Sequence, residues 1–243
     1  TSGSSNVAIG YQALFTNLTN SNCVAIGSEA LTLATQDDNT AIGTHCAADL
    51  STGNRNVAVG RGAFDVATTS DDCVAIGYNC LDAATTVDDA VGVGASCLTK
   101  LTTGSRSTAV GKSALQECTT GYSNTACGFD AGGNVSTGNH NTLIGRSAGV
   151  ALTDGTFNTL IGGEAEVDSA SSQHRIVIGC NVTGTTNNTL HFGKSGNVVS
   201  NTFTSNATFT RNSDISLKKD IYTNNDCGLD FVNDLRTVTF KWK

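Results

Sequence analysis

The chain has no proline and no methionine among its 243 residues, and it has one tryptophan. Charged residues make up 14% of the sequence and aromatic residues 6%. This is too little charge for a disordered chain and too few large apolar side chains for an ordinary globular core. Thin, repeated layers of Val, Ile, Leu and Ala fit this composition better.

The sequence also lacks the features of nucleic-acid-binding and membrane-spanning proteins. The net charge is −7 and no stripe of basic residues occurs, so no nucleic-acid partner is expected. No apolar run reaches the roughly 18 residues that span a bilayer, so no membrane insertion is expected. The sequence begins at Thr1 and has no methionine, which indicates an interior piece of a longer protein, so a leader peptide cannot be judged.

A glycine that ends a short apolar segment recurs through most of the chain, as in VAIG, TAIG and TLIG. Successive glycines are seventeen positions apart, with a single spacing of sixteen, and a weaker copy ends at Gly193. Such a period is typical of a solenoid. The repeat glycines are Gly10, Gly27, Gly43, Gly60, Gly77, Gly94, Gly111, Gly128, Gly145, Gly162 and Gly179. Residues 1–193 are therefore predicted to form an all-β, parallel β-solenoid or β-roll, a rod of roughly 50–60 Å.

Each repeat suggests two short strands and two corners. Alternation within VAIG places the first and third side chains on one face, which we expect to be the core, with Ala allowing close approach on the other. A further apolar residue follows four positions after the glycine. A second glycine column, seven positions before the first, lies in turn contexts such as STGN and is predicted to need positive φ. Its members are Gly3, Gly53, Gly104, Gly121, Gly138 and Gly155.

Nine cysteines are present, and most occupy repeat positions that hold small or apolar residues elsewhere. They are expected to be buried free thiols, made in a reducing compartment. Cys80 and Cys97 share a column and would be neighbours in a stack, so a disulfide there is possible but not needed. No spacing indicates a zinc site, and no cofactor is expected.

Acidic and hydroxyl side chains also recur in phase. Asp71-Asp72 and Asp88-Asp89 lie in adjacent repeats, with Arg55 one repeat earlier; an exposed charge ladder and a calcium site are both open interpretations. The Thr columns could form a flat surface for ice or glycans, or Asn and Thr ladders that satisfy backbone groups. The threonines are Thr40, Thr108, Thr125, Thr142 and Thr159. Tyr11, Tyr78 and Tyr122 are candidate platforms for sugars, and no carboxylate pair typical of glycosidases is evident.

The units NVAIGYQAL and NTAIG resemble the NSVAIG-type head repeats of trimeric autotransporter adhesins. The resemblance covers roughly residues 1–193, although those heads have shorter, variable repeats. It implies a left-handed parallel β-roll and a homotrimer in which small residues lie where the rolls meet. After Gly193 the period breaks, and residues 194–212 alternate polar and apolar side chains; we expect strand there, wrapped with two other chains into a β-prism stem.

Residues 213–243 and the two positions before them contain RNSDISLKKDI and LRTVTFKWK, which resemble the start of the intramolecular chaperone of phage tailspikes and tail fibres, the peptidase S74 type. Thr237 stands where that family usually has Pro, and the sequence ends at Lys243, before most of such a domain. The resemblance implies a partly helical domain that trimerises the chains and then cuts itself off. Carried over, the scissile bond is Asn212–Ser213, Ser213 is the nucleophile and Lys218 its base. From the residues alone, Ser213 would be a cap and Lys218 a solvated side chain.

These observations favour a trimeric viral fibre on the virion surface, made in the host cytoplasm, that contacts a glycan or protein receptor of the host. A cell-surface trimeric adhesin is the alternative, and a glycan-degrading tailspike fits less well because no paired carboxylates are evident. No substrate-directed enzymatic activity is expected.

Overall fold

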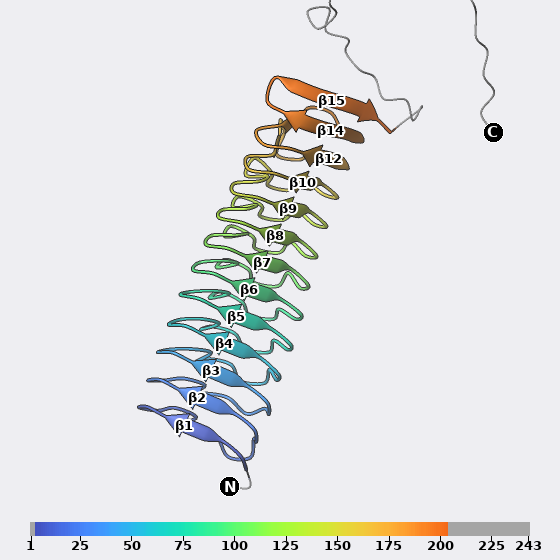
Figure 1. Cartoon of the computed structure of the whole chain (residues 1–243). Coiled ribbons are helices and arrows are strands. Elements are labelled where there is room, and N and C mark those ends of the chain that lie inside the picture. Colours follow the sequence, from blue (N-terminus) through green and yellow to red (C-terminus); the bar gives the residue numbers. More distant parts are fainter. Residues whose placement is uncertain (1–2, 204–243) are drawn as a thin grey trace, which may run out of the picture. The chain divides into compact units, whose positions relative to one another are not determined.

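The computed structural model describes residues 3–203. They form a coil in which each turn, here called a rung, corresponds to one sequence repeat and stacks on the turn before (Figure 1). The predicted all-β parallel solenoid is thereby confirmed. Ten strands of three residues are β1 (Val7–Ile9), β2 (Val24–Ile26), β3 (Thr40–Ile42), β4 (Val57–Val59), β5 (Val74–Ile76), β6 (Val91–Val93), β7 (Thr108–Val110), β8 (Thr125–Cys127), β9 (Thr142–Ile144) and β10 (Thr159–Ile161). They are followed by β11 (Glu166–Val167), β12 (Arg175–Ile178), β13 (Thr183–Gly184), β14 (Thr189–Lys194) and β15 (Asn197–Thr202).

Thirteen strands form one sheet in the order β1 to β10, then β12, β14 and β15. The pairs from β1 to β14 are parallel and in register, so that Val74 lies opposite Val91 and Ile76 opposite Val93. In-register stacking places the same repeat position of successive rungs about 4.8 Å apart. Every column found in the sequence therefore becomes a physical ladder along the coil.

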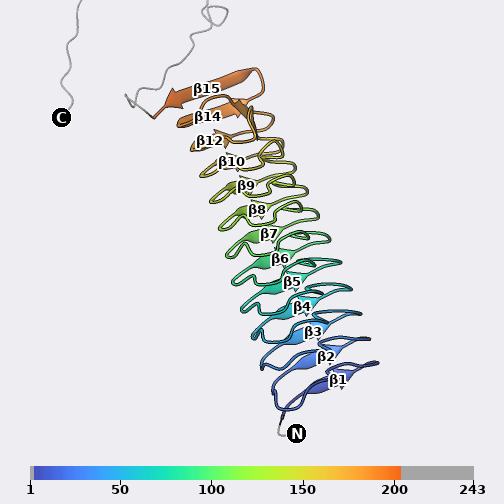
Figure 2. The ribbon, with the colours of Figure 1, turned by 180° about the vertical axis from the view of Figure 1, so that it is seen from behind.

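Most rungs contain one strand, not the two predicted. The other side of each rung is built from turns, and a second sheet forms only where β11 pairs with β13 among the described residues. The turns still bond from rung to rung: the N–H of Leu98 donates to the carbonyl of Ala114 at 3.0 Å. The view from behind shows the same regular stack (Figure 2). Backbone pairing between rungs therefore continues without strand geometry.

The alternation within the three-residue strands is the reverse of our prediction. The middle residue points into the coil, as Ala25, Ala75 and Ala109 do with no exposed surface, whereas the first and third residues face outward. So short a rung encloses little space, and that space is already filled by the apolar residue four positions after the repeat glycine, such as Leu98. Only a small residue fits opposite most of these side chains, so the Ala column lies inside the coil and cannot contact a neighbouring chain.

The repeat glycines are required for both conformation and space. Gly94 has φ of 142°, and a Cβ there would lie 2.5 Å from the carbonyl oxygen of Gly111 on the next rung. The second glycine column does not adopt the positive φ that we predicted. It instead allows close approach between rungs, because a Cβ on Gly121 would lie 2.5 Å from the carbonyl oxygen of Gly138.

The period ends in a β-hairpin. Strand β15 pairs antiparallel with β14 through a two-residue turn in which Gly196 has φ of 80°. The prediction of strand after Gly193 is confirmed for residues 197–202, and their partner is the preceding strand of the same chain. The rest of the proposed stem and the chaperone-like segment, including Ser213 and Lys218, lie outside the described residues.

Candidate functional site

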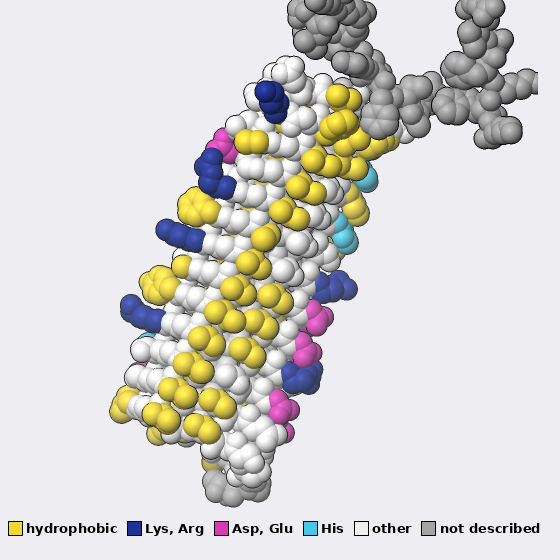
Figure 3. Space-filling view, viewed as in Figure 1, with side chains coloured by type: hydrophobic (Ala, Val, Ile, Leu, Met, Phe, Trp, Pro, Cys, Tyr) yellow, Lys and Arg dark blue, Asp and Glu magenta, His cyan; other side chains and the backbone are white. Residues whose placement is uncertain are grey.

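The outer strand face consists of the first and third side chains of strands β1–β10. Ile176 and Ile178 of β12, and Leu190 and Phe192 of β14, continue it in register. The third position of these ten strands holds mainly Ile and Val, whose side chains are substantially exposed. Ile76 is exposed by 38%, and Ile178, which aligns with this position, by 41%. Figure 3 shows these apolar side chains as rows that run along the coil, from one strand to the next. No residue of strands β1–β10 is charged, and the Lys, Arg, Asp and Glu side chains in this view lie along the two flanks. The face is therefore a long, uncharged surface with a row of mainly apolar side chains at the third strand position.

The composition of this face changes along the coil. The first strand position is Val in β1, β2 and β4–β6, but Thr in β3 and β7–β10. The Thr column noted in the sequence therefore lies on the outer strand face beside the Ile and Val row. It leaves the rungs of β7–β10 with one apolar row, where most rungs before them have two.

The Asn column is buried and bonds from rung to rung, as one of our two interpretations held. The Oδ1 of Asn141 accepts from the backbone N–H of Asn158 at 3.0 Å and from its side-chain amide at 3.0 Å. The Nδ2 of Asn141 donates to Asn124 and to the carbonyl of Gly155. This Asn ladder (Asn124, Asn141 and Asn158, with Asn39 and Asn56 nearer the N-terminus) satisfies backbone groups inside the coil.

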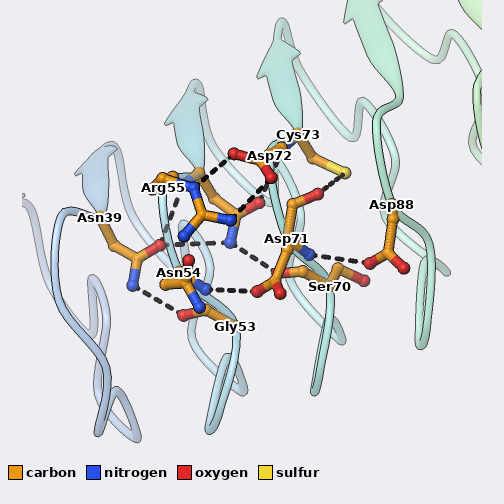
Figure 4. A network of polar contacts seen from close by, with 10 residues as sticks. Asn39, Gly53, Asn54, Arg55, Ser70, Asp71, Asp72, Cys73 and Asp88 are labelled. Atoms are coloured by element: carbon orange, nitrogen blue, oxygen red, sulfur yellow. Dashed lines mark hydrogen bonds and ion pairs between the residues drawn. The ribbon is translucent and has the colours of Figure 1, made fainter.

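The aspartate columns have partners that argue against a calcium site (Figure 4). Arg55 donates to both carboxylate oxygens of Asp72, at 2.6 and 2.7 Å. Asp71 accepts from the N–H of Asn54, and Asp88 accepts from the N–H of Asp71. Within the described part of the chain, no group of three or more His, Cys, Asp or Glu could hold a metal ion. The Asp71, Asp72, Asp88 and Asp89 columns therefore form the exposed ladder, in which Arg55 pairs with the acidic rung that follows.

A polar groove lies on the turns beyond the strands, with a volume of about 300 Å³. It is lined by His45, Arg61, Gly62, Asp65, Tyr78, Asn79 and Asp82. Asp65 and Asp82 occupy one repeat position on successive rungs, so the structure brings together a carboxylate pair that our sequence analysis missed. The available signal was that these two residues lie one repeat apart in the sequence.

The pKa values of the two groove carboxylates are raised because these groups are partly buried and lie close together. Burial raises the pKa of Asp65, neighbouring Asp82 raises it further, and His45 opposes that rise. Burial also raises the pKa of Asp82. Tyr78, one of the proposed sugar platforms, contributes an exposed ring at the same place. The groove can accept hydrogen bonds from a polar ligand and offer the ring as a packing surface.

Six cysteines are buried free thiols, as predicted: Cys23, Cys46, Cys73, Cys80, Cys97 and Cys118. Burial raises the pKa of Cys46 to about 12, which keeps its thiol protonated and inert. Cys127 and Cys180 are exposed and depart from that prediction. Cys127 is exposed because it stands at the third, outward-facing position of β8.

Comparisons with family models, with curated proteins and with solved structures find no match for this chain. Among the described residues, no helix is long and apolar enough to cross a membrane.

Proposed function

We propose that this chain is a structural and adhesive segment of a trimeric viral fibre used for attachment to a host. The observation that carries the proposal is the outer strand face, which is regular and uncharged along strands β1–β10 and holds mainly Ile and Val at its third position. Monomeric proteins rarely expose a continuous apolar surface of this extent. In this proposal, two further copies of the chain cover the outer strand face.

Self-association suits this face because its side chains repeat with the rungs. A copy aligned in parallel would meet the same Ile and Val spacing at every rung, so one favourable contact would be repeated along the coil. Completing the burial of an Ile that is about 40% exposed is worth roughly 1 kcal/mol. Summed over some ten rungs, this is of the size needed to offset the entropy of association.

Host attachment would use surfaces that the trimer leaves open. The groove between His45 and Asp82 lies on the turns, away from the outer strand face, and its lining suits hydroxyl or amide groups of a glycan or protein receptor. The buried thiols are compatible with synthesis in a host cytoplasm before display on the virion surface. A cell-surface trimeric adhesin would use the same face in the same way.

Maturation by self-cleavage is also part of the proposal. It rests on the sequence resemblance at residues 213–243, where Ser213 would attack the Asn212–Ser213 bond with Lys218 as its base. A desolvated lysine with a lowered pKa can accept the serine proton, which makes the pair chemically sound.

The experiment is native mass spectrometry of the protein expressed from its complete gene. A trimer whose subunits end at Asn212 would support both the fibre and the cut. A trimer with intact C-termini would keep the fibre and reject the cut. A monomer at micromolar concentration would overturn the trimeric fibre.

A further inference from the structure

Cys80 and Cys97 occupy the same repeat position on two successive rungs. Among the described cysteines they are the one pair that does so. They follow β5 and β6, and their Sγ atoms lie 3.0 Å apart. Both are fully buried, and the column continues with Ala63 on one side and Ala114 on the other. The two sulfurs therefore face each other in an enclosed space with no other thiol in the same column beside them.

Gly92 supplies independent evidence that this space is built for two sulfurs. The middle residue of strands β1–β10 is Ala or Leu except in β6, where it is Gly92. Its backbone is not in the positive-φ region, so conformation does not require glycine there. A Cβ at this position would lie 2.5 Å from the Sγ of Cys80 and 3.2 Å from that of Cys97. The missing side chain makes room for the thiol pair.

The geometry of the stack suits a bond between the two sulfurs. In-register rungs are about 4.8 Å apart, and disulfides usually join residues whose Cα atoms are about 4.4–6.8 Å apart. Closing the sulfur separation to a bond needs only side-chain rotation and a small backbone shift. Cys46, in the same column but flanked by Ala30 and Ala63, has no such partner among the described residues of that column.

We propose that Cys80 and Cys97 form a disulfide that joins the β5 and β6 rungs when the folding chain meets a small-molecule disulfide such as oxidised glutathione. One thiolate attacks the oxidant and releases a first thiol, and the second cysteine then displaces a second thiol. Two S–H bonds are lost, one S–S bond forms, and the oxidant takes up the two electrons and two protons. This inference does not depend on the trimer.

Burial determines when the reaction can occur. The pKa of Cys80 is raised because its thiol shares a hydrogen bond with Cys97 and because both are shielded from water. In the folded rungs the Cys80 thiol therefore stays protonated and is a poor nucleophile. The bond forms while the rungs assemble or open, and once formed it is protected from reductants by the same burial.

The test is to refold the full chain in reduced or in oxidised glutathione, alkylate all thiols in denaturant, and count them by intact mass. The reduced sample should show nine alkylated cysteines and the oxidised sample two fewer. Digestion before Asp82, Asp88 and Asp89 separates Cys80 from Cys97 unless they are bonded. The bond should raise the melting temperature by about 5–10 °C. Nine alkylated cysteines after oxidising refolding would overturn the proposal.

Matched variants identify the pair. Cys97→Ala introduces the residue found at this position in neighbouring rungs, and it should abolish both the loss of two thiols and the rise in melting temperature. Cys46→Ala should leave both unchanged apart from one fewer starting thiol. Loss of two thiols in Cys97→Ala would assign the disulfide to other cysteines and reject the proposal.

Gly92→Ala tests the space itself. It should lower the melting temperature of the reduced wild-type chain but be tolerated when Cys80 and Cys97 are both replaced by Ala. Equal effects in the two backgrounds would show that Gly92 is not there to accommodate the sulfurs.

Discussion

At the scale of single residues, the most unusual position is the fourth after each repeat glycine. Leu98, Leu115 and Phe64 adopt φ of 50° to 60° there, a conformation that side-chain-bearing residues rarely take. Each is fully buried, and the N–H of Leu98 is bonded to the next rung. Burial and inter-rung bonding therefore offset a local backbone cost that recurs in most rungs.

Replacing Leu98 by Ile tests this cost, because the volume is kept but the branch at Cβ clashes with the left-handed conformation. We expect a loss of roughly 2–3 kcal/mol in the free energy of unfolding. Leu143→Ile, in the extended middle position of β9, is the control and should cost about 1 kcal/mol. Denaturant titration measures both, and equal losses would contradict the backbone argument.

His191 gives a residue-scale prediction about pH. Burial and the nearby Arg175 lower its pKa below 6.5, while Asp168 opposes them. As the pH falls, His191 is therefore protonated in the unfolded chain before it is protonated in the folded chain. The stability that neutral His191 contributes is present above pH 6.5 and is lost as the pH falls through the lower pKa of the folded state. The slope can reach about 1.4 kcal/mol per pH unit.

His191→Leu should remove this decline, because Leu occupies the equivalent strand position at Leu143 and Leu160. Melting temperatures of both proteins from about pH 5 to pH 8 provide the comparison. A decline of the same size in the variant would assign the effect to other groups.

At the scale of an element, the Asn ladder connects rungs that have little strand to hold them. Asn141 accepts from the next rung and donates to its neighbours, so a single side chain serves three rungs. The ladder meets Arg175 at its C-terminal end: the Arg175 N–H donates to Asn158, and its guanidinium donates to Asp168 and Asn187. A buried arginine is tolerated there because its donors have partners.

Asn141→Ala removes a ladder member and leaves the Gly155 carbonyl and the Asn158 N–H without their partner. We expect a loss of about 2–4 kcal/mol in the free energy of unfolding. Asn141→Ser should lose less, because Ser107 in the same column accepts from the N–H of Asn124. Urea denaturation separates the two, and a harmless Ala variant would mean that the ladder does not stabilise the coil.

At the scale of the whole molecule, the described coil is a one-dimensional stack. Each rung contacts mainly the rungs before and after it, so stability is approximately a sum of nearest-neighbour terms. Lateral association through the outer strand face would couple rungs of different chains and slow unfolding.

Ile76→Lys places a charge in the middle of the outer strand face. If this face joins the chains, the concentration for half-dissociation of the trimer should rise at least 100-fold, about 2.7 kcal/mol. Gln36→Lys, on an exposed turn, adds the same charge as a control. Native mass spectrometry over a dilution series gives the result, and a trimer unaffected by Ile76→Lys would place the interface elsewhere.

Much of the coil could be predicted from the glycine spacing, because a fixed period forces equivalent residues into register. Which side chains of each strand face inward could not be predicted in this way. The segment VAI reads equally well with Val and Ile inward or outward, since alternation defines two faces without saying which one is enclosed. The pairing of Asp65 and Asp82 could have been predicted from their spacing of one repeat, but the groove around them depends on how the turns fold.

The sequence by itself determined the period, the all-β class, the ladders and the positions of most buried thiols, because these follow from spacing alone. Only the tertiary structure decided that Ala fills the interior and that Ile and Val face outward. The reason is volume: a short rung with a Leu already inside has room for a methyl group opposite it, and the larger side chains must lie on the surface.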